Sequence, residues 1–244
     1  MARDSALLDH AARTGESVFS IYSWCRPTLS FGRNQRARGR YDLQRLGERG
    51  VDVVRRPTGG RAILHYREIT YSVAAPVSAQ ESLRDAYGRI NAVLLAGLES
   101  LGVTALIAPA SEGAPLKPGA IPCFEQPSEG EITAGGRKLV GSAQWRDTSA
   151  FLQHGSILVE DDQTELASFA APGADEAGRK PPAPATLREL LGRAPASAEL
   201  AEAMFAAVRR VESAGGSEMP ENEIRSDALS RVPSFLDQDW TWRR

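Results

Sequence analysis

The sequence predicts an α+β fold, in which a mixed β-sheet carries helices and a small helical part follows at the carboxy terminus. Three observations predict it. Residues 83–101 place apolar side chains at intervals of three and four, the spacing of a helix with one buried face. Residues 131–160 contain short apolar runs broken by turn residues, which is typical of a β-meander. Residues 186–229 return to helical spacing after a proline-rich segment.

The remaining elements follow from the same rules. Residues 4–13 and 41–49 have helical spacing. The turn signal Pro57-Thr58-Gly59-Gly60 separates two predicted strands. We expect the helices to cover one face of the sheet. Strands are expected at residues 18–24, 28–31, 51–55, 61–65, 69–75, 103–108, 131–134, 138–145 and 151–160, and short helices at residues 186–191, 197–211 and 221–229.

The composition divides the chain into one large domain and an appendage. Residues 1–170 alternate strand and helix patterns and are predicted to form the main domain. Residues 171–185 are rich in Gly, Ala and Pro and are interpreted as a linker. Residues 186–244 are expected to form a small helical extension packed on the same domain.

Charge and hydropathy exclude several function classes. The net charge of −2 gives no field of the kind that nucleic-acid binders use. No run reaches the roughly 18 apolar residues that cross a bilayer, and the amino terminus lacks the apolar core of a signal peptide. We therefore expect a cytoplasmic protein, monomeric, without nucleic-acid or membrane partners. The two cysteines and three histidines show no ligand spacing, so no metal site is predicted.

The first motif of interest is RRPTGGRAILHYREITYS, residues 55–72. Two strands joined through Thr58-Gly59-Gly60 can present backbone N–H groups at close range, because glycine lacks a Cβ. Arg55, Arg56 and Arg61 surround this turn with positive charge, and His65 follows on the next strand. Taken alone, the pattern also fits a tight turn with solvated arginines.

The second motif is GGRKLVGSAQWRDTSAFLQHGSILVEDD, residues 135–162. Of the 29 basic residues of the chain only three are lysines, and Lys138 is one of them. Gly141 permits close approach of a ligand or of another backbone. His154-Gly155-Ser156 lies mid-strand, where packing alone predicts a polar-faced strand with a bulge at Gly155.

Together the two motifs resemble the catalytic domain shared by lipoate–protein ligases, biotin–protein ligases and octanoyl transferases. RRPTGGRAILH…TYS and GRKLVGSAQ…LQHGSIL carry the resemblance, and weaker similarity covers most of residues 1–170. It implies a mixed sheet that carries an acyl pocket, with the Gly59-Gly60 loop over the tethered or activated acid.

The segment Cys123-Phe124-Glu125-Gln126-Pro127-Ser128 resembles the CF-x-x-PS segment of cysteine-dependent octanoyltransferases. In those enzymes the cysteine takes the acyl group from acyl carrier protein. The alternative for Cys123 is an inert loop cysteine. If Lys138 lies near the sulfur, its charge favours the thiolate and it can polarise the acyl carbonyl.

The resemblance therefore implies a set of site residues. Cys123 and Lys138 are predicted to be catalytic. The predicted substrate-binding residues are Arg56, Thr58, Gly59, Gly60, Arg61, His65, Tyr71, Ser72, Gly141, Ser142, Ala143, His154 and Gly155.

The implied reaction moves octanoyl from acyl carrier protein, through a Cys123 thioester, to a lysine of a lipoyl-domain or glycine-cleavage H-type protein. No cofactor is expected on this route. One alternative is a lipoate–protein ligase, which needs ATP and Mg²⁺ and tolerates loss of Cys123. Another is an amidotransferase between two lipoyl-type proteins, and a third is a regulator that binds an acyl group without turnover.

Six arginines between residues 33 and 49 form the densest run of positive charge in the chain. Such a run is most often a solvated surface. Acyl carrier proteins and lipoyl domains are acidic as families, so we hypothesise that these arginines steer carrier docking, with an effect mainly on association rate. The run consists of Arg33, Arg36, Arg38, Arg40, Arg45 and Arg49.

Overall fold

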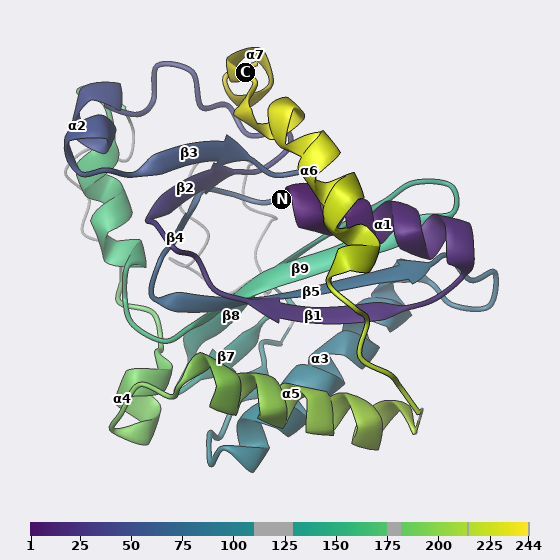
Figure 1. Ribbon diagram of the computed structural model, residues 1–244. Coiled ribbons are helices and arrows are strands. Elements are labelled where there is room, and N and C mark those ends of the chain that lie inside the picture. The colour runs from purple at the N-terminus through teal and green to yellow at the C-terminus, as the bar shows by residue number, and fades with distance from the viewer. Residues whose placement is uncertain (110–128, 175–181, 214, 244) are drawn as a thin grey trace.

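In the computed structural model, the residues described are 1–109, 129–174, 182–213 and 215–243. The predicted nucleophile Cys123 and its CF-x-x-PS segment lie outside these ranges, as does part of the predicted linker. Within the described part, the α+β class is confirmed. Two sheets, one large and one small, are packed with helices (Figure 1).

The large sheet of the described chain has six strands, and every neighbouring pair is antiparallel. The pairing register of its strands positions the residues of the candidate site. Ser156 lies between Thr70 and Gly141, and His154 lies between Ser72 and Ala143, so two rows of small or polar residues cross three strands. In spatial order the strands are β1 (Val18–Tyr22), β5 (Glu68–Pro76), β9 (Ala150–Leu158), β8 (Arg137–Arg146), β7 (Ile132–Ala134) and β6 (Leu106–Ile107).

The small sheet makes the fold mixed. Strand β2 (Thr28–Phe31) is its centre, parallel to β3 (Asp52–Arg55) and antiparallel to β4 (Ile63–His65). The parallel pair needs a crossover, and this crossover contains α2 (Leu43–Glu48). Leu29 and Phe31 of β2 are fully buried in the core of this sheet.

Helices cover both faces of the large sheet, whereas the sequence was expected to place them on one (Figure 1). On one face, α3 (Leu83–Ser100) and α5 (Ser197–Glu212) bury their apolar stripes in the main core. On the other, Leu7, Leu8 and Ala11 of α1 (Ala2–Thr14) pack against strands β5 and β9, and α6 (Asn222–Leu236) lies along α1.

Short elements complete the chain. A 3-10 helix, η1 (Gln163–Phe169), closes the core of the small sheet. Leu187 of α4 (Leu187–Leu191) joins the same core as α5, so this part of the carboxy-terminal region packs on the main core. The chain continues through α7 (Gln238–Thr241), beside strand β3 (Figure 1).

Most predicted elements form close to their expected bounds, with a few corrections. Of the strand expected at residues 103–108, only Leu106–Ile107 pairs. The helix expected to end at residue 229 runs on to Leu236. No bulge interrupts β9 at Gly155, and the register shift lies instead in β7, at Ile132/Thr133.

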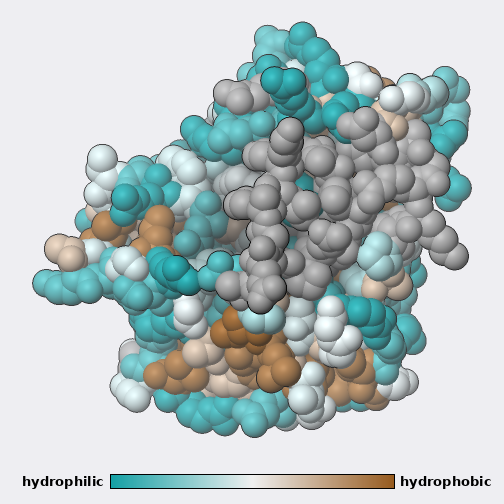
Figure 2. Space-filling model, turned by 180° about the vertical axis from the view of Figure 1, so that it is seen from behind, coloured by the Kyte–Doolittle hydropathy of each residue, from teal (hydrophilic) through white to brown (hydrophobic). Residues whose placement is uncertain are grey.

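On the face that Figure 2 shows, most of the described surface is hydrophilic, and hydrophobic residues gather toward the base, where Figure 1 places α3 and α5. No helix among the described residues is both long enough and apolar enough to span a bilayer.

Candidate active site

The turn between β3 and β4 is held from inside by a buried arginine. Arg56 is 2% exposed, in contrast to the solvated arginine that the bare motif allows. Its guanidinium donates to the carbonyl and hydroxyl oxygens of Ser30, at 3.0 and 2.9 Å, and to the carbonyls of Gly59 and Arg61, at 3.1 and 2.6 Å. Arg56 therefore fixes the backbone of the turn that Thr58, Gly59 and Gly60 form.

Two glycines make this turn possible. Gly60 has φ +93°, a left-handed conformation that other residues rarely adopt. A Cβ on Gly32, at the end of β2, would lie 2.0 Å from the carbonyl oxygen of Gly60. The turn thus folds directly over the end of β2, and neither glycine can gain a side chain without moving backbone.

Arg55 ties the same turn to the far end of the chain. Its side chain is fully buried and donates to the carbonyls of Trp240, Thr241 and Gly32, at 3.1, 2.9 and 2.6 Å. The indole of Trp240 donates back to the Arg55 carbonyl at 3.0 Å. The carboxy-terminal tail therefore helps to hold the turn in place through these hydrogen bonds.

One histidine–carboxylate pair joins α1 to the turn. His154 Nδ1 lies 2.9 Å from Asp4 Oδ2, and His154 Nε2 lies 2.6 Å from the Thr58 hydroxyl. Tyr22 donates to the same Asp4 oxygen at 2.8 Å. Asp4, Thr58 and His154 are all buried. Burial and the neighbouring Asp4 carboxylate raise the pKa of Tyr22 well above its usual value, so the phenol stays protonated.

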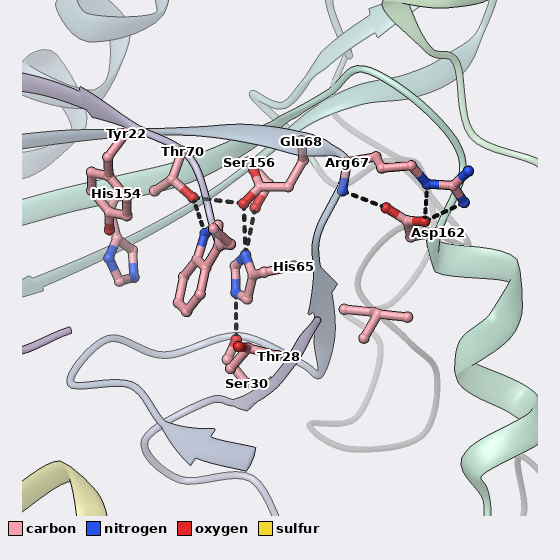
Figure 3. A network of polar contacts seen from close by, with 12 residues as sticks. Tyr22, Thr28, Ser30, His65, Arg67, Glu68, Thr70, His154, Ser156 and Asp162 are labelled. Atoms are coloured by element: carbon pink, nitrogen blue, oxygen red, sulfur yellow. Dashed lines mark hydrogen bonds and ion pairs between the residues drawn. The ribbon is translucent and has the colours of Figure 1, made fainter. Parts of the chain in front are cut away.

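A second histidine–carboxylate pair lies on the same face of the large sheet, further along strands β5 and β9 (Figure 3). His65 Nδ1 is 2.9 Å from Glu68 Oε1, and His65 Nε2 is 2.8 Å from the Ser30 hydroxyl. Thr70 donates to the same Glu68 oxygen at 2.7 Å and accepts from the Trp24 indole at 2.8 Å. Burial lowers the pKa of His65, and the Glu68 carboxylate opposes this only in part.

The strands behind the turn bring small residues together. A Cβ on Gly155 would lie 2.3 Å from the Gly141 carbonyl oxygen and 2.7 Å from the Tyr71 ring, so only glycine fits at this point of β9. Tyr71 donates to the Ser142 hydroxyl at 2.6 Å and accepts from Gln153 at 2.9 Å. Burial raises the pKa of Tyr71, which keeps it a neutral hydrogen-bonding wall.

These residues enclose a cavity between the turn and the large sheet. Eight of its lining residues were predicted from the sequence: Arg56, Gly60, His65, Gly141, Ser142, Ala143, His154 and Gly155. The others are Met1, Ile63, Thr70 and Ser156.

The other predicted residues that the structure describes do not line the cavity. Thr58, Gly59 and Arg61 belong to the turn, and Tyr71 is hydrogen-bonded to Ser142. Ser72 lies opposite His154 on β5. Lys138 is 2% exposed, donates to Glu131 at 2.5 Å, and is not among the residues that line the cavity.

Sequence reasoning missed Asp4, Tyr22, Ser30 and Trp24. A signal for one of them exists. Asp4 shares the buried face of α1 with Leu7, Leu8 and Ala11, so it is a charge where the helical pattern calls for an apolar residue. Such a charge is found buried only when it is paired.

A possible cation site lies away from the cavity, between α1 and α6. The ligand atoms of His10, Glu16 and Glu223 lie within 4.8 Å of one another, and both carboxylates are exposed. Glu16 already pairs with His10 Nε2 at 3.1 Å. This group is a surface ion pair as it stands.

Residues 1–209 match the protein family described as the lipoyl protein ligase A/B catalytic domain. The octanoyltransferase LipM of Kyrpidia tusciae is 36% identical over 100% of this chain and 94% of its own length. The octanoyltransferase LipM of Carboxydothermus hydrogenoformans is 43% identical over 68% of this chain, but the match spans only 62% of that protein.

Solved structures agree on the fold. A lipoate–protein ligase A bound with ATP superposes with a TM-score of 0.78 at 20% identity, covering 99% of this chain and 92% of the other. A protein from T. acidophilum, Ta0514, described as a putative lipoate protein ligase, gives 0.77 at 19% identity, covering 100% and 92%.

Proposed function

Because the chain belongs to the lipoyl protein ligase A/B catalytic-domain family, we propose that it is an octanoyltransferase of lipoate biosynthesis. Two named octanoyltransferases at 36% and 43% identity, one aligned over this whole chain, support an acyltransferase. The observation that carries the proposal is the cavity beside the Gly59-Gly60 turn, whose lining on strands β8 and β9 includes the small residues Gly141, Ala143 and Gly155. These small residues leave room for an unbranched acyl chain.

The proposed route passes through a thioester on Cys123. In the first step the thiolate attacks the thioester of octanoyl–acyl carrier protein, one C–S bond forms as another breaks, and the carrier leaves as a thiol. In the second step a lysine amine attacks the acyl-enzyme, so that a C–N bond replaces the C–S bond. A thioester is activated enough for amide formation, so neither ATP nor Mg²⁺ is required.

The proposed acceptor is a lysine of a lipoyl domain or glycine-cleavage H-type protein, and the proposed donor is acyl carrier protein. One protein of similar fold is described together with its E2 lipoyl domain as part of an archaeal lipoylation system. The arginine run supplies a complementary charge for such acidic partners, because Arg36, Arg38, Arg45 and Arg49 are exposed.

Intact-mass measurement tests the route. The protein is mixed with octanoyl–acyl carrier protein without ATP, beside the C123A variant. We expect an octanoyl adduct on the wild type, none on C123A, and discharge of the adduct when a lipoyl domain is added. The matched control is C25A, which alters the exposed Cys25 and should acylate normally.

Other outcomes identify the alternatives. Modification of the lipoyl domain only when ATP and free octanoate or lipoate are supplied, with C123A fully active, identifies a ligase. Formation of the adduct from an octanoylated H-type protein, but not from acyl carrier protein, identifies an amidotransferase. An acyl group that binds without covalent transfer identifies a regulator.

A further inference from the structure

The width of the cavity depends on how closely the turn lies against the large sheet. Arg56 and Gly60 line the cavity from the side of the turn, and Gly141 and Ala143 line it from strand β8. A Cβ placed on Gly60 would lie 3.9 Å from the Cβ of Ala143, so the turn passes close to β8 at this point. Movement of the turn away from β8 would therefore widen the space that is proposed to hold the acyl chain.

Arg33, which follows directly on Gly32, connects the turn to strand β8. Its backbone N–H donates to the Thr58 carbonyl at 2.7 Å. Its guanidinium carbon lies 5.2 Å from the centre of the Trp145 ring, within the range of a cation–π contact. Because alternate side chains of a strand share a face, Trp145 lies on the same face of β8 as Ala143. Arg33 thus holds the turn through its backbone and β8 through its side chain.

A second tryptophan holds Arg33 from the side of the carboxy-terminal tail. The Arg33 guanidinium carbon lies 5.7 Å from the centre of the Trp240 ring. Trp240 is itself fixed, because its indole donates to the Arg55 carbonyl at 3.0 Å and its carbonyl accepts from the Arg55 side chain at 3.1 Å. The Arg243 guanidinium lies 4.0 Å from the centre of the same ring and donates to the Arg33 carbonyl. The tail therefore holds both the side chain and the backbone of Arg33.

Arg33 differs in its surroundings from the exposed members of the arginine run. It is half-buried, and within the described ranges its guanidinium makes neither an ion pair nor a hydrogen bond, so the two rings are the contacts that position it. A planar guanidinium stacks on aromatic rings, whereas the compact ammonium of lysine does not replace it there. Lysine should therefore be a poor substitute at residue 33, although it keeps the positive charge.

We propose that Arg33 and Trp240 are positioning residues that determine acyl specificity, because they hold the turn against β8 at a distance that fits an unbranched chain. The inference rests on the proposed acyl transfer and adds to it the class of acyl group that the site selects. Neither residue lines the cavity, so both act through the turn. Loss of either ring contact lets the turn move away from Ala143, and a branched chain then fits more easily.

The test compares two acyl donors with the same number of carbon atoms. The wild type and the R33K and W240L variants are mixed, without ATP, with octanoyl– or 6-methylheptanoyl–acyl carrier protein, and formation of the acyl-enzyme is followed by intact mass. The wild type should prefer octanoyl about 10-fold or more, the usual discrimination of one methyl group in a close-fitting pocket. The ratio of kcat/KM for the two donors should fall about 3- to 10-fold in both variants, as expected for weakened cation–π contacts.

The ratio of the two donors separates a positioning role from a loss of stability. A variant that is merely less stable contains less active enzyme, which slows the reactions of both donors by the same factor and leaves their ratio unchanged. The matched control is R36K, which makes the same exchange at an exposed arginine of the run and should keep the wild-type ratio.

Amide hydrogen exchange gives a second readout, which needs no acyl donor. The amide of Arg33 is protected by its hydrogen bond to the Thr58 carbonyl, and the amide of Val103 is protected by the Leu98 carbonyl at the end of α3. In W240L, exchange of the Arg33 amide should become about 3- to 10-fold faster, because the turn loses a ring contact that holds it. Exchange of the Val103 amide, on the other face of the large sheet, should change by less than about twofold.

The two proposals fail in different ways. Absence of an acyl-enzyme from either donor in the wild type refutes the transfer route itself. An acyl-enzyme that forms without preference for octanoyl, or with the same preference in the wild type, R33K and W240L, refutes the positioning role. Unchanged exchange of the Arg33 amide in W240L also refutes it, because the turn would then be held without the tail.

Discussion

The two histidine–carboxylate pairs of this protein have similar geometry but different origins. His65 and Glu68 are three residues apart, at the turn from β4 to β5, and the hydrogen bonds of His65 lead through Ser30 to the buried Arg56. His154 and Asp4 are 150 residues apart and meet only because α1 packs across β5 and β9. Each pair keeps one carboxylate oxygen, Glu68 Oε2 or Asp4 Oδ1, without a hydrogen-bond partner among the described residues. The pairs therefore differ in how far apart in the chain their members lie, and the remote pair holds a helix against the large sheet.

The largest expected effect comes from exchanging each histidine for glutamine. H154Q should lower the unfolding free energy by about 3–5 kcal/mol, because the buried Asp4 carboxylate loses its ring partner and α1 loses a contact that holds it to the sheet. H65Q should lower the unfolding free energy by about 2–3 kcal/mol, because Glu68 and Ser30 lose a buried partner. Urea unfolding of both variants gives the comparison. Equal losses in the two variants would falsify the difference between a remote and a local pair.

The next largest effect is expected from a substitution on strand β9. His154 and Ser156 flank Gly155 on β9, and a methyl group at Gly155 would meet the Gly141 carbonyl. Because the obstacle is a backbone atom, G155A should lower the unfolding free energy by more than about 3 kcal/mol. Acylation of the enzyme and transfer of the acyl group to the acceptor should both become slower.

A matched glycine provides the control for that variant. Gly47 lies in α2, and a methyl group added there would have nothing within 4 Å, so G47A should be neutral or stabilise by up to about 1 kcal/mol. Thermal unfolding of the two variants gives the comparison. A G155A protein as stable as G47A would mean that β8 and β9 can separate without cost.

How far the sequence alone could lead differs between the pairs. The turn residues, the glycine wall and both histidines follow from two motifs, because each motif is contiguous and its neighbours are set by strand pairing. Asp4 could be flagged as a buried charge on α1, but its partner could not be named, since nothing local links residues 4 and 154. The burial of Arg55 and Arg56 was likewise not predictable, because their partners are backbone carbonyls from distant segments.

The surroundings of Lys138 show the same limit. The register shift at Ile132/Thr133 brings Lys138 opposite Thr133, and its amine donates to Glu131. A shift of register cannot be read from periodicity, because it depends on how two strands pair.

A moderate change in the unfolding free energy is expected when the pH is lowered. Burial lowers the pKa of His65, so the unfolded chain binds this proton more readily than the folded one does. The stability it contributes is present above the unfolded-state pKa of about 6.5 and is lost as the pH falls toward the lower folded value. Between pH 7.5 and 5.5, wild-type unfolding free energy should therefore fall more steeply than that of H65Q, by at most about 1.4 kcal/mol per pH unit. Parallel curves in urea titrations at both pH values would contradict this.

The smallest change in stability is expected at Thr70, at the edge of the hydrogen-bond network of His65 and Glu68. Thr70 is buried, donates to Glu68 and accepts from the Trp24 indole, so T70V should cost about 1–2 kcal/mol in unfolding free energy by leaving both groups short of a partner. T70S keeps the hydroxyl and should recover most of that loss. Urea unfolding of the two variants gives the comparison. A T70V protein as stable as the wild type would mean that Glu68 and the Trp24 indole find other partners, and the local pair would then depend on its neighbours no more than the remote pair does.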